Sequence, residues 1–197
     1  MGRRLLLLTE DVEQLKDEIA GLQVGDRFTF GDYHGPIEWR VLEKSYGNLT
    51  VISEHALDCK PFDEEYGEYG DDWDSSSLKK WLNSEFFNKA FNSEEKSLIE
   101  NTSVGKVFLL SIEEAMDYFS SNNDIRCRPT NYANSQAAEP SKNFCEWWLR
   151  SKGDVEFSIA CVTSEGSFDL RDYYLDDFFF VRPAMVLSIS DQLELRF

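Results

Sequence analysis

The amino-acid sequence predicts an α+β fold with one main domain. Strand-like segments lie early and late in the chain and helical segments lie between them, an order typical of this class. Hydrophobic residues make up 42% of the 197 residues, enough to bury one sizeable core. Aromatic residues make up 14%, which favours a strand-containing, loop-rich core over a plain helical bundle. We therefore expect an N-terminal helix over residues 1–22 and a single domain over residues 23–197.

The N-terminal segment has the spacing of an amphipathic helix. Its apolar residues recur at steps of three and four, with acidic residues between them. They are Leu5, Leu8, Val12, Leu15, Ile19 and Leu22. Gly21 and Gly25 then end the pattern. Because fewer than three heptads are short for a coiled coil, we expect the helix to dock on its own domain. A homodimer formed through residues 5–22 is the alternative.

The next segment predicts strands followed by helices. Alternating apolar residues predict an antiparallel meander over 27–30, 37–42 and 49–52. Helix caps follow at Asp74 and at residues 75–77.

Two further helices have clear start signals in the sequence. Asn92 with Glu95, and Ser111 with Glu114, have the capping-box spacing that begins a helix. Residues 106–110, between these two helices, are strand-like.

The C-terminal part predicts a long loop and then strands. Residues 120–146 are rich in Asn, Ser and Pro and are expected to form a loop. Strands are expected over 147–149, 157–162 and 179–189.

The charge excludes two classes of partner. The formal net charge of −17 repels phosphate backbones and anionic lipids, and we find no basic patch, so neither nucleic acid nor a membrane surface is expected as a partner. The apolar run at residues 5–8 is shorter than a signal-peptide core of about 7–15 residues or a spanning helix of about 20. We expect a cytoplasmic protein, unless a leader has been removed.

The four cysteines have no metal-binding or disulfide-scaffold spacing. We expect Cys59, Cys127, Cys145 and Cys161 to be reduced and buried. A bridge between Cys145 and Cys161 stays open if the protein is exported.

Two arginines lie inside apolar runs near the C-terminus. Arg150 follows two tryptophans in Trp-Trp-Leu-Arg-Ser, and Arg182 lies in Val-Arg-Pro-Ala. A guanidinium keeps its charge, so each needs an acidic or carbonyl partner. We interpret both as structural residues that join strands. The alternative is a pair of cations that grips a carboxylate or phosphate.

The sequence offers few catalytic or metal-binding groups. His34 and His55 lie in or beside loops, and no nucleophile, phosphate-loop, dinucleotide or zinc motif accompanies them. The acidic clusters at residues 63–72 and 169–177 have the oxygen ligands that calcium prefers, but not the EF-hand spacing. We interpret them as solvated loops, predict no cofactor or metal, and keep calcium as an open alternative.

Several short segments occur in a characteristic order along the chain. They are Ile37–Leu42, Ile52–Ser53, Leu57–Asp58, Trp73–Asn83, Phe86–Phe91, Val107–Ser111, Pro129–Ala133 and the two arginine motifs. This ordered set resembles the bacterial DUF6273 family, a domain of unknown function. The resemblance covers roughly residues 24–189, and its implied origin is bacterial or phage. The two arginine motifs look similar to C-type lectin-like domains, including the formylglycine-generating branch. The resemblance implies small antiparallel sheets, two to four short helices and long loops.

The chain departs from the better-known lectin-like proteins at their functional motifs. Glu139-Pro140-Ser141 lacks the amide or carboxylate that completes a calcium and sugar site. No close cysteine pair matches the copper site of formylglycine-generating enzymes, so neither activity is carried over.

We predict a non-enzymatic recognition module that binds a protein, peptide or glycan through the long loops between residues 120 and 177. In the lectin-like arrangement the loop before the last strand faces the ligand, which makes Arg171, Asp172, Tyr173 and Tyr174 the candidate binding residues. One ring of the tryptophan pair, Trp148, is the candidate for stacking on the ligand. The alternatives are an uncharacterised oxidase or hydrolase that uses the loop histidines and carboxylates, or a structural domain for self-association.

Overall fold

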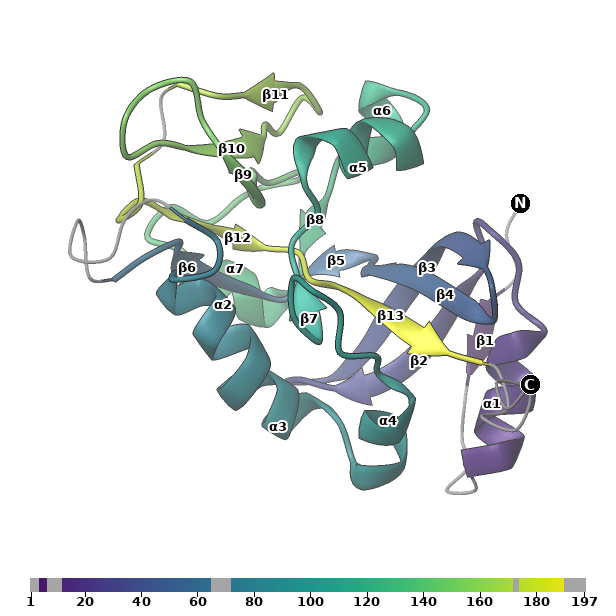
Figure 1. Cartoon of the computed structure of the whole chain (residues 1–197). Coiled ribbons are helices and arrows are strands. Elements are labelled where there is room, and N and C mark those ends of the chain that lie inside the picture. The colour runs from purple at the N-terminus through teal and green to yellow at the C-terminus, as the bar shows by residue number, and fades with distance from the viewer. Residues whose placement is uncertain (1–3, 7–11, 65–71, 172–173, 190–197) are drawn as a thin grey trace.

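The fold is built from two β-sheets with helices packed around them (Figure 1). It is taken from a computed structural model, which describes residues 4–6, 12–64, 72–171 and 174–189. The mixed α+β class predicted from the sequence is confirmed.

The first sheet has six strands and contains the predicted meander. In spatial order they are β1 (Arg4–Leu6), β2 (Arg27–Asp32), β3 (Pro36–Ser45), β4 (Asn48–Ser53), β13 (Ala184–Ser188) and β7 (Val107–Phe108). Burial alternates along β2 and through the first six residues of β3, as expected for strands with one face on the core. The meander strands β2, β3 and β4 pair antiparallel, as predicted.

The second sheet has five strands and carries the tryptophan pair. In order they are β11 (Phe168–Asp169), β10 (Ile159–Val162), β9 (Trp147–Lys152), β12 (Phe178–Val181) and β6 (Asp58–Pro61). All pairs are antiparallel except β12 with β9. A separate parallel pair joins β5 (His55–Ala56) to β8 (Arg128–Pro129).

The chain passes between the two sheets twice at one place, which we call the sheet junction (residues 53–57 and 182–183). Ile52 lies opposite Ala184 in the first sheet, and Asp58 lies opposite Val181 in the second. The five residues 53–57 therefore lie opposite only two, Arg182 and Pro183. The longer of these two segments turns away from the pairing and forms β5. The strand predicted over 179–189 is consequently two strands in different sheets, separated at Arg182 and Pro183.

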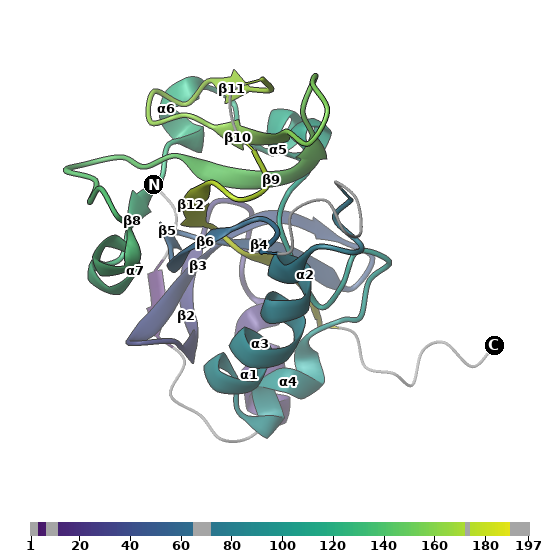
Figure 2. The ribbon, with the colours of Figure 1, turned by 90° about the vertical axis from the view of Figure 1, so that its left-hand side faces the viewer.

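The central helices lie where the caps predicted them. A continuous helical run consists of α2 (Ser77–Trp81), the π-helical η1 (Leu82–Phe86) and α3 (Phe87–Ala90). Both predicted capping boxes are present, at the starts of α4 (Ser93–Leu98) and α5 (Ile112–Tyr118). Figure 2 shows α2, α3 and α4 on one side of the fold and α5 beside the second sheet.

The segment predicted as a loop over 120–146 contains regular structure. It includes α6 (Asn122–Ile125), β8 and α7 (Asn131–Gln136). Ser121 and Thr130 cap the two helices through their side-chain oxygens. The prediction of two to four short helices was therefore too low for the described part of the chain.

The N-terminal helix is shorter than predicted. It is α1 (Val12–Ala20), whereas Arg4–Leu6 forms strand β1, which pairs parallel with β2. Leu15, Ile19 and Leu22 are buried within the chain, so the apolar stripe packs on its own domain. The predicted positions Leu8 and part of the 1–22 segment lie outside the described residues.

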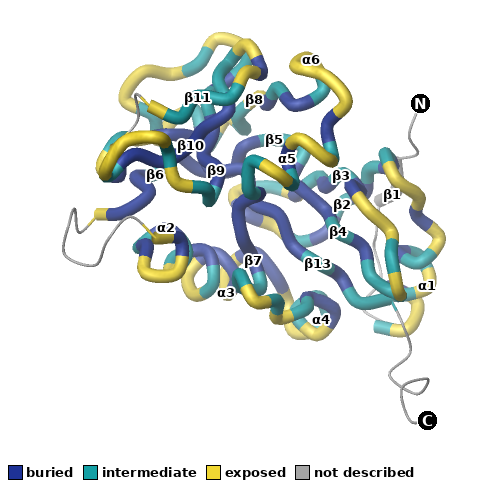
Figure 3. Tube along the Cα trace, turned by 45° about the horizontal axis from the view of Figure 1, so that its top comes forward, coloured by how far each residue is buried: buried dark blue, intermediate teal, exposed yellow. Residues whose placement is uncertain are grey.

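Buried residues run through the strands of both sheets (Figure 3). The largest fully buried side chains include Trp39, Trp147, Trp148 and, unusually, Arg182. No helix in the described ranges has the length and apolar content needed to cross a membrane.

Candidate functional site

Arg182 lies at the sheet junction and is fully buried, with 0% of its surface exposed. Its Nε donates to the carbonyl of Ser53 at 3.0 Å and its Nη1 donates to the carbonyl of Ile125 at 3.0 Å. The guanidinium carbon lies 5.0 Å from the ring centre of Trp147 and 5.4 Å from that of Phe119, within cation–π range. Arg182 thus joins the junction to the end of α6.

No carboxylate contacts this guanidinium among the described residues, and its Nη2 makes no hydrogen bond there. Burial lowers the pKa of Arg182, and the charge of Arg40 acts in the same direction. The nearby Cys127 and Glu54 act in the opposite direction. An arginine keeps its charge in proteins. Arg182 is therefore a buried cation whose charge is offset by the two carbonyl dipoles, the two aromatic rings and the nearby Glu54 and Cys127.

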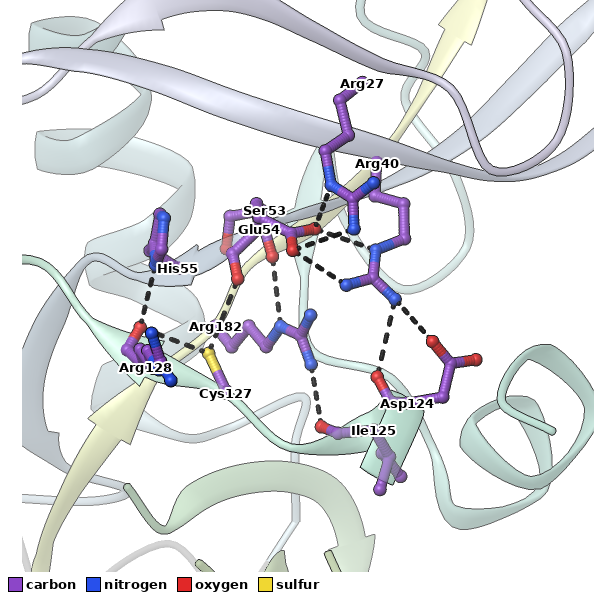
Figure 4. Close-up of polar contacts among 10 residues, drawn as sticks. All are labelled: Arg27, Arg40, Ser53, Glu54, His55, Asp124, Ile125, Cys127, Arg128 and Arg182. Atoms are coloured by element: carbon purple, nitrogen blue, oxygen red, sulfur yellow. Dashed lines mark hydrogen bonds and ion pairs between the residues drawn. The ribbon is translucent and has the colours of Figure 1, made fainter. Parts of the chain in front are cut away.

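The carboxylate of Glu54 forms ion pairs with two other arginines, Arg27 and Arg40 (Figure 4). Arg40 donates to both carboxylate oxygens of Glu54 at 2.8 Å and to Asp124 at 2.9 Å, while Arg27 donates to Glu54 at 3.1 Å. Burial raises the pKa of Glu54, but the hydrogen bonds from Arg40 and Arg27 outweigh it and lower the pKa to about 2.

Two cysteines lie directly opposite each other beside this cluster. Cys127 and Cys145 form an isolated antiparallel bridge, and the amide of Cys145 donates to the carbonyl of Cys127 at 2.8 Å. Both residues are buried. The cysteine pairing kept open from the sequence, Cys145 with Cys161, is wrong in this structure, because Cys161 lies opposite Trp148 and Asp169 in the second sheet.

A surface hollow of about 380 Å³ adjoins the thiol pair. Its lining includes four aromatic residues, Phe144, Phe178, Phe179 and Phe180, together with Glu139, Glu146 and Cys145. A hollow of about 440 Å³ beside Arg150 has one aromatic residue in its lining, Trp73.

The wall of the aromatic hollow is held in place by polar contacts. Asn134 of α7 makes two hydrogen bonds with the backbone of Ser141, at 3.1 and 2.7 Å. The hydroxyl of Ser141 donates to the carbonyl of Phe144 at 2.7 Å. The guanidinium carbons of Arg126 and Arg128 lie 3.7 and 4.9 Å from the ring centre of Phe144. The hollow therefore has a preformed wall.

The family of this chain follows from its sequence match. The family model for the domain of unknown function DUF6273 matches residues 46–189. The chain belongs to the DUF6273 family. No similar protein was found among curated proteins, and no similar fold was found among solved structures.

Arg150 of this DUF6273 domain has a carboxylate partner. Its Nη2 donates to Oε1 of Glu114 at 2.7 Å, its Nη1 donates to Oε2 of the same residue, and Nη1 also donates to the carbonyl of Leu109. Glu114 is the capping-box residue of α5. The pair is partly exposed, with 15% and 32% of the two side chains accessible.

The ligand-facing residues predicted from the sequence have different environments. Arg171 and Tyr174 are exposed, and Nε of Arg171 lies 3.7 Å from a carboxylate oxygen of Asp154. Asp172 and Tyr173 lie outside the described residues. Trp148 is fully buried, and its indole N–H donates to the carbonyl of Lys60 at 2.9 Å. The prediction that Trp148 stacks on a ligand is therefore wrong, because both rings of the tryptophan pair are in the core.

The two histidines contact rings and backbone in the DUF6273 fold. His34 is exposed, has a positive φ of 56°, and stacks on Tyr132 with ring centres 3.5 Å apart. Nδ1 of His55 lies 3.3 Å from the carbonyl of Arg128. Across the residues that the structure describes, no group of three or more His, Cys, Asp or Glu side chains has the arrangement of a metal site.

Sequence reasoning missed the hollow and the Cys127–Cys145 pair. The run of three phenylalanines at residues 178–180 was the signal that the sequence offered, since all three line the hollow and Phe178 is 62% exposed in the structure. The two cysteines are far apart in sequence, so their proximity depends on tertiary structure.

Proposed function

We propose that this DUF6273 domain is a non-enzymatic recognition module that binds an apolar or aromatic side chain of a peptide or protein segment. The observation that carries the proposal is the aromatic hollow, which is lined by seven residues between 137 and 146, by Ser164 and by residues 178–180. A concave apolar surface with a few fixed polar groups is the usual form of a binding site. Much of its lining comes from the segment predicted to bear the ligand-binding loops.

The electrostatics favour a basic partner. The whole chain has a net charge of −17, and Glu139 and Glu146 are in the lining. The nearby cations Arg126 and Arg128 have their guanidiniums over the ring of Phe144. Charge complementarity raises association rates and disfavours acidic partners. A peptide with an apolar anchor and flanking lysine or arginine residues fits both features.

We also propose that the arrangement is C-type lectin-like. Two sheets whose pairs are mostly antiparallel, short helices and the long segment between α5 and β9 support this assignment. An experimental structure that superimposes on lectin-like domains with the same strand order would test it, and a different strand order would exclude it.

The binding proposal is tested with a bead-displayed peptide library and the purified, fluorescently labelled full chain. Selected peptides are then titrated by fluorescence anisotropy. Ala138→Trp fills the hollow from an exposed position in its wall, and Phe178→Ala removes its exposed ring. Each is expected to weaken binding by roughly tenfold or more, the usual effect of losing an interface anchor.

Tyr46→Ala is the matched control, since Tyr46 is fully exposed and lies in a different hollow. It should leave the affinity unchanged. Selected peptides that bind both hollow variants as well as the wild type, or no better than scrambled sequences, would exclude the aromatic hollow as the binding site.

A further inference from the structure

The surroundings of Cys127 and Cys145 differ from those of the other two cysteines. The chain brings the residues directly opposite each other in an antiparallel bridge. Directly opposed residues on antiparallel strands have Cα atoms about 4.5–5.5 Å apart, within the range that a disulfide spans. Cys59 and Cys161 lie in the second sheet, on β6 and β10, and are opposite Phe180 and Trp148 respectively.

A buried cation lies beside the pair. Arg182 interacts electrostatically with both thiols, and its buried Nη2 has no hydrogen-bond acceptor in the described ranges. The other charged groups that act on Arg182 are Arg40 and Glu54. Glu54 is already bonded to Arg40 and Arg27, so the guanidiniums of Arg27, Arg40 and Arg182 are accompanied by two carboxylates, Glu54 and Asp124 (Figure 4). Figure 4 also labels Arg128, whose guanidinium lies over the ring of Phe144. An anion at the thiol pair would balance the remaining positive charge of Arg182.

The two thiols have unequal acidities. Burial raises the pKa of Cys127, but a hydrogen bond from Cys145 and the charge of Arg182 outweigh it, so the pKa lies below its usual value. Burial raises the pKa of Cys145, and the neighbouring Cys127 raises it further. In its neutral form Cys127 donates to the carbonyl of Arg128 at 3.5 Å. A thiol with a lowered pKa beside a second thiol is the arrangement found in reactive dithiols.

The aromatic hollow borders the cysteine pair at Cys145. Cys145 forms part of the wall of that hollow, although only 2% of its surface is exposed. An oxidant small enough to enter the hollow would meet Cys145 at its wall, while Cys127 behind it is only 1% exposed.

We propose that Cys127 and Cys145 form a redox-active dithiol that a peroxide oxidises to a disulfide. The ionised sulfur attacks one peroxide oxygen, the O–O bond breaks, and the departing oxygen leaves as water after taking a proton. This step leaves a sulfenic acid. The second sulfur then attacks the sulfenic sulfur, the S–S bond forms, the S–O bond breaks, and the hydroxyl leaves as a second water with the remaining thiol proton. Two thiols are oxidised and one peroxide is reduced to two waters.

The test treats the purified, reduced full chain with hydrogen peroxide and follows each cysteine by thiol blocking and peptide mass spectrometry. The expected product is a peptide pair linked through Cys127 and Cys145 that dithiothreitol releases. The pair should react at least about ten times faster than Cys59 or Cys161. Burial raises the pKa of the Cys59 thiol to about 11 and raises that of Cys161 further, so both serve as internal references.

Three variants distinguish selective oxidation of Cys127 and Cys145 from general oxidation of all four cysteines. Cys145→Ser should abolish the disulfide and leave a sulfenic acid on Cys127 that dimedone traps once the oxidised protein is unfolded. Cys59→Ser should change nothing. Ala138→Trp, which narrows the hollow, should slow oxidation of the pair without slowing that of Cys59. Circular dichroism confirms that each variant is folded.

Equal oxidation of all four cysteines, or a fully folded protein whose only disulfides join separate chains, would overturn the proposal. Peptide binding is not part of this experiment, so its result is independent of the recognition function.

Discussion

Arg150 and Arg182 lie in similar apolar sequence contexts, but the fold compensates their charges in different ways. Arg150 is partly exposed and makes two hydrogen bonds to the carboxylate of Glu114. Arg182 is fully buried at the sheet junction and bonds two backbone carbonyls, with two rings and a thiol pair around it. The comparison shows that a charged residue in an apolar run can either anchor a helix cap near the surface or hold the crossing between two sheets.

The largest expected effect is that of Arg182→Met. The substitution keeps an apolar stem but leaves the carbonyls of Ser53 and Ile125 without a donor inside the core. We expect the free energy of unfolding to fall by about 4 kcal/mol, since each unsatisfied buried carbonyl costs about 1–3 kcal/mol and the ring contacts are also lost. Urea denaturation followed by tryptophan fluorescence measures this change. A loss no greater than that of Arg150→Met would remove the distinction between the two sites.

Glu54→Gln tests whether the carboxylate of Glu54, on one segment of the junction, is as important as Arg182 on the other. The folded pKa of Glu54 is lowered to about 2 from 4.5. A lowered pKa stabilises the fold at pH values above the pKa that the group has in the unfolded chain. This contribution to stability is lost as the pH falls from about 4.5 towards 2. The variant should lose about 3 kcal/mol at neutral pH, because each pKa unit corresponds to about 1.4 kcal/mol.

The same variant should show a weaker dependence of stability on acid between these two pH values. Denaturation curves at a series of pH values check both parts. Wild type and Glu54→Gln losing stability in parallel on acidification would contradict the assignment of this acid dependence to Glu54.

Arg150→Met should have the smallest effect of the three. Glu114 is 32% exposed and remains hydrated after the substitution, and it still bonds the backbone amide of Ser111 at 2.9 Å. We expect a loss of about 1.5 kcal/mol, mainly from the charged hydrogen bonds. The same urea measurement applies, and a loss above that of Arg182→Met would reverse the order.

The order of the central elements could be predicted from the sequence because their signals are local. The capping boxes at Asn92 and Ser111 begin helices as predicted, and the meander strands follow the alternation of buried residues. The need for a partner at each arginine also follows from chemistry alone. Sequence does not say which partner, since Glu114 and the Ser53 carbonyl lie far along the chain from the arginines that they bind.

The junction itself could not be predicted, because it depends on long-range pairing. The run from Phe179 to Ile189 has strand composition throughout, and only Pro183 indicates a break. Its two halves join different sheets because residues 53–57 on the opposite side form an excursion that pairs with β8. The hollow and the opposed cysteines result from the same long-range arrangement. The N-terminal helix was predicted to be longer than it is, because Leu5 fits the apolar spacing of the helix although it belongs to strand β1.

Amide hydrogen exchange tests most directly whether Arg182 holds the two sheets together. The amides of Ser53 and Leu57 donate across the junction to Pro183 and Val181 at 2.9 and 2.8 Å, and the amide of Val41 donates within the first part of the chain to Asp26 at 3.0 Å. In Arg182→Met, protection at Ser53 and Leu57 should fall by about tenfold or more relative to Val41, while Arg150→Met should leave this ratio unchanged. An unchanged ratio in Arg182→Met, or an equal loss in both variants, would contradict the account.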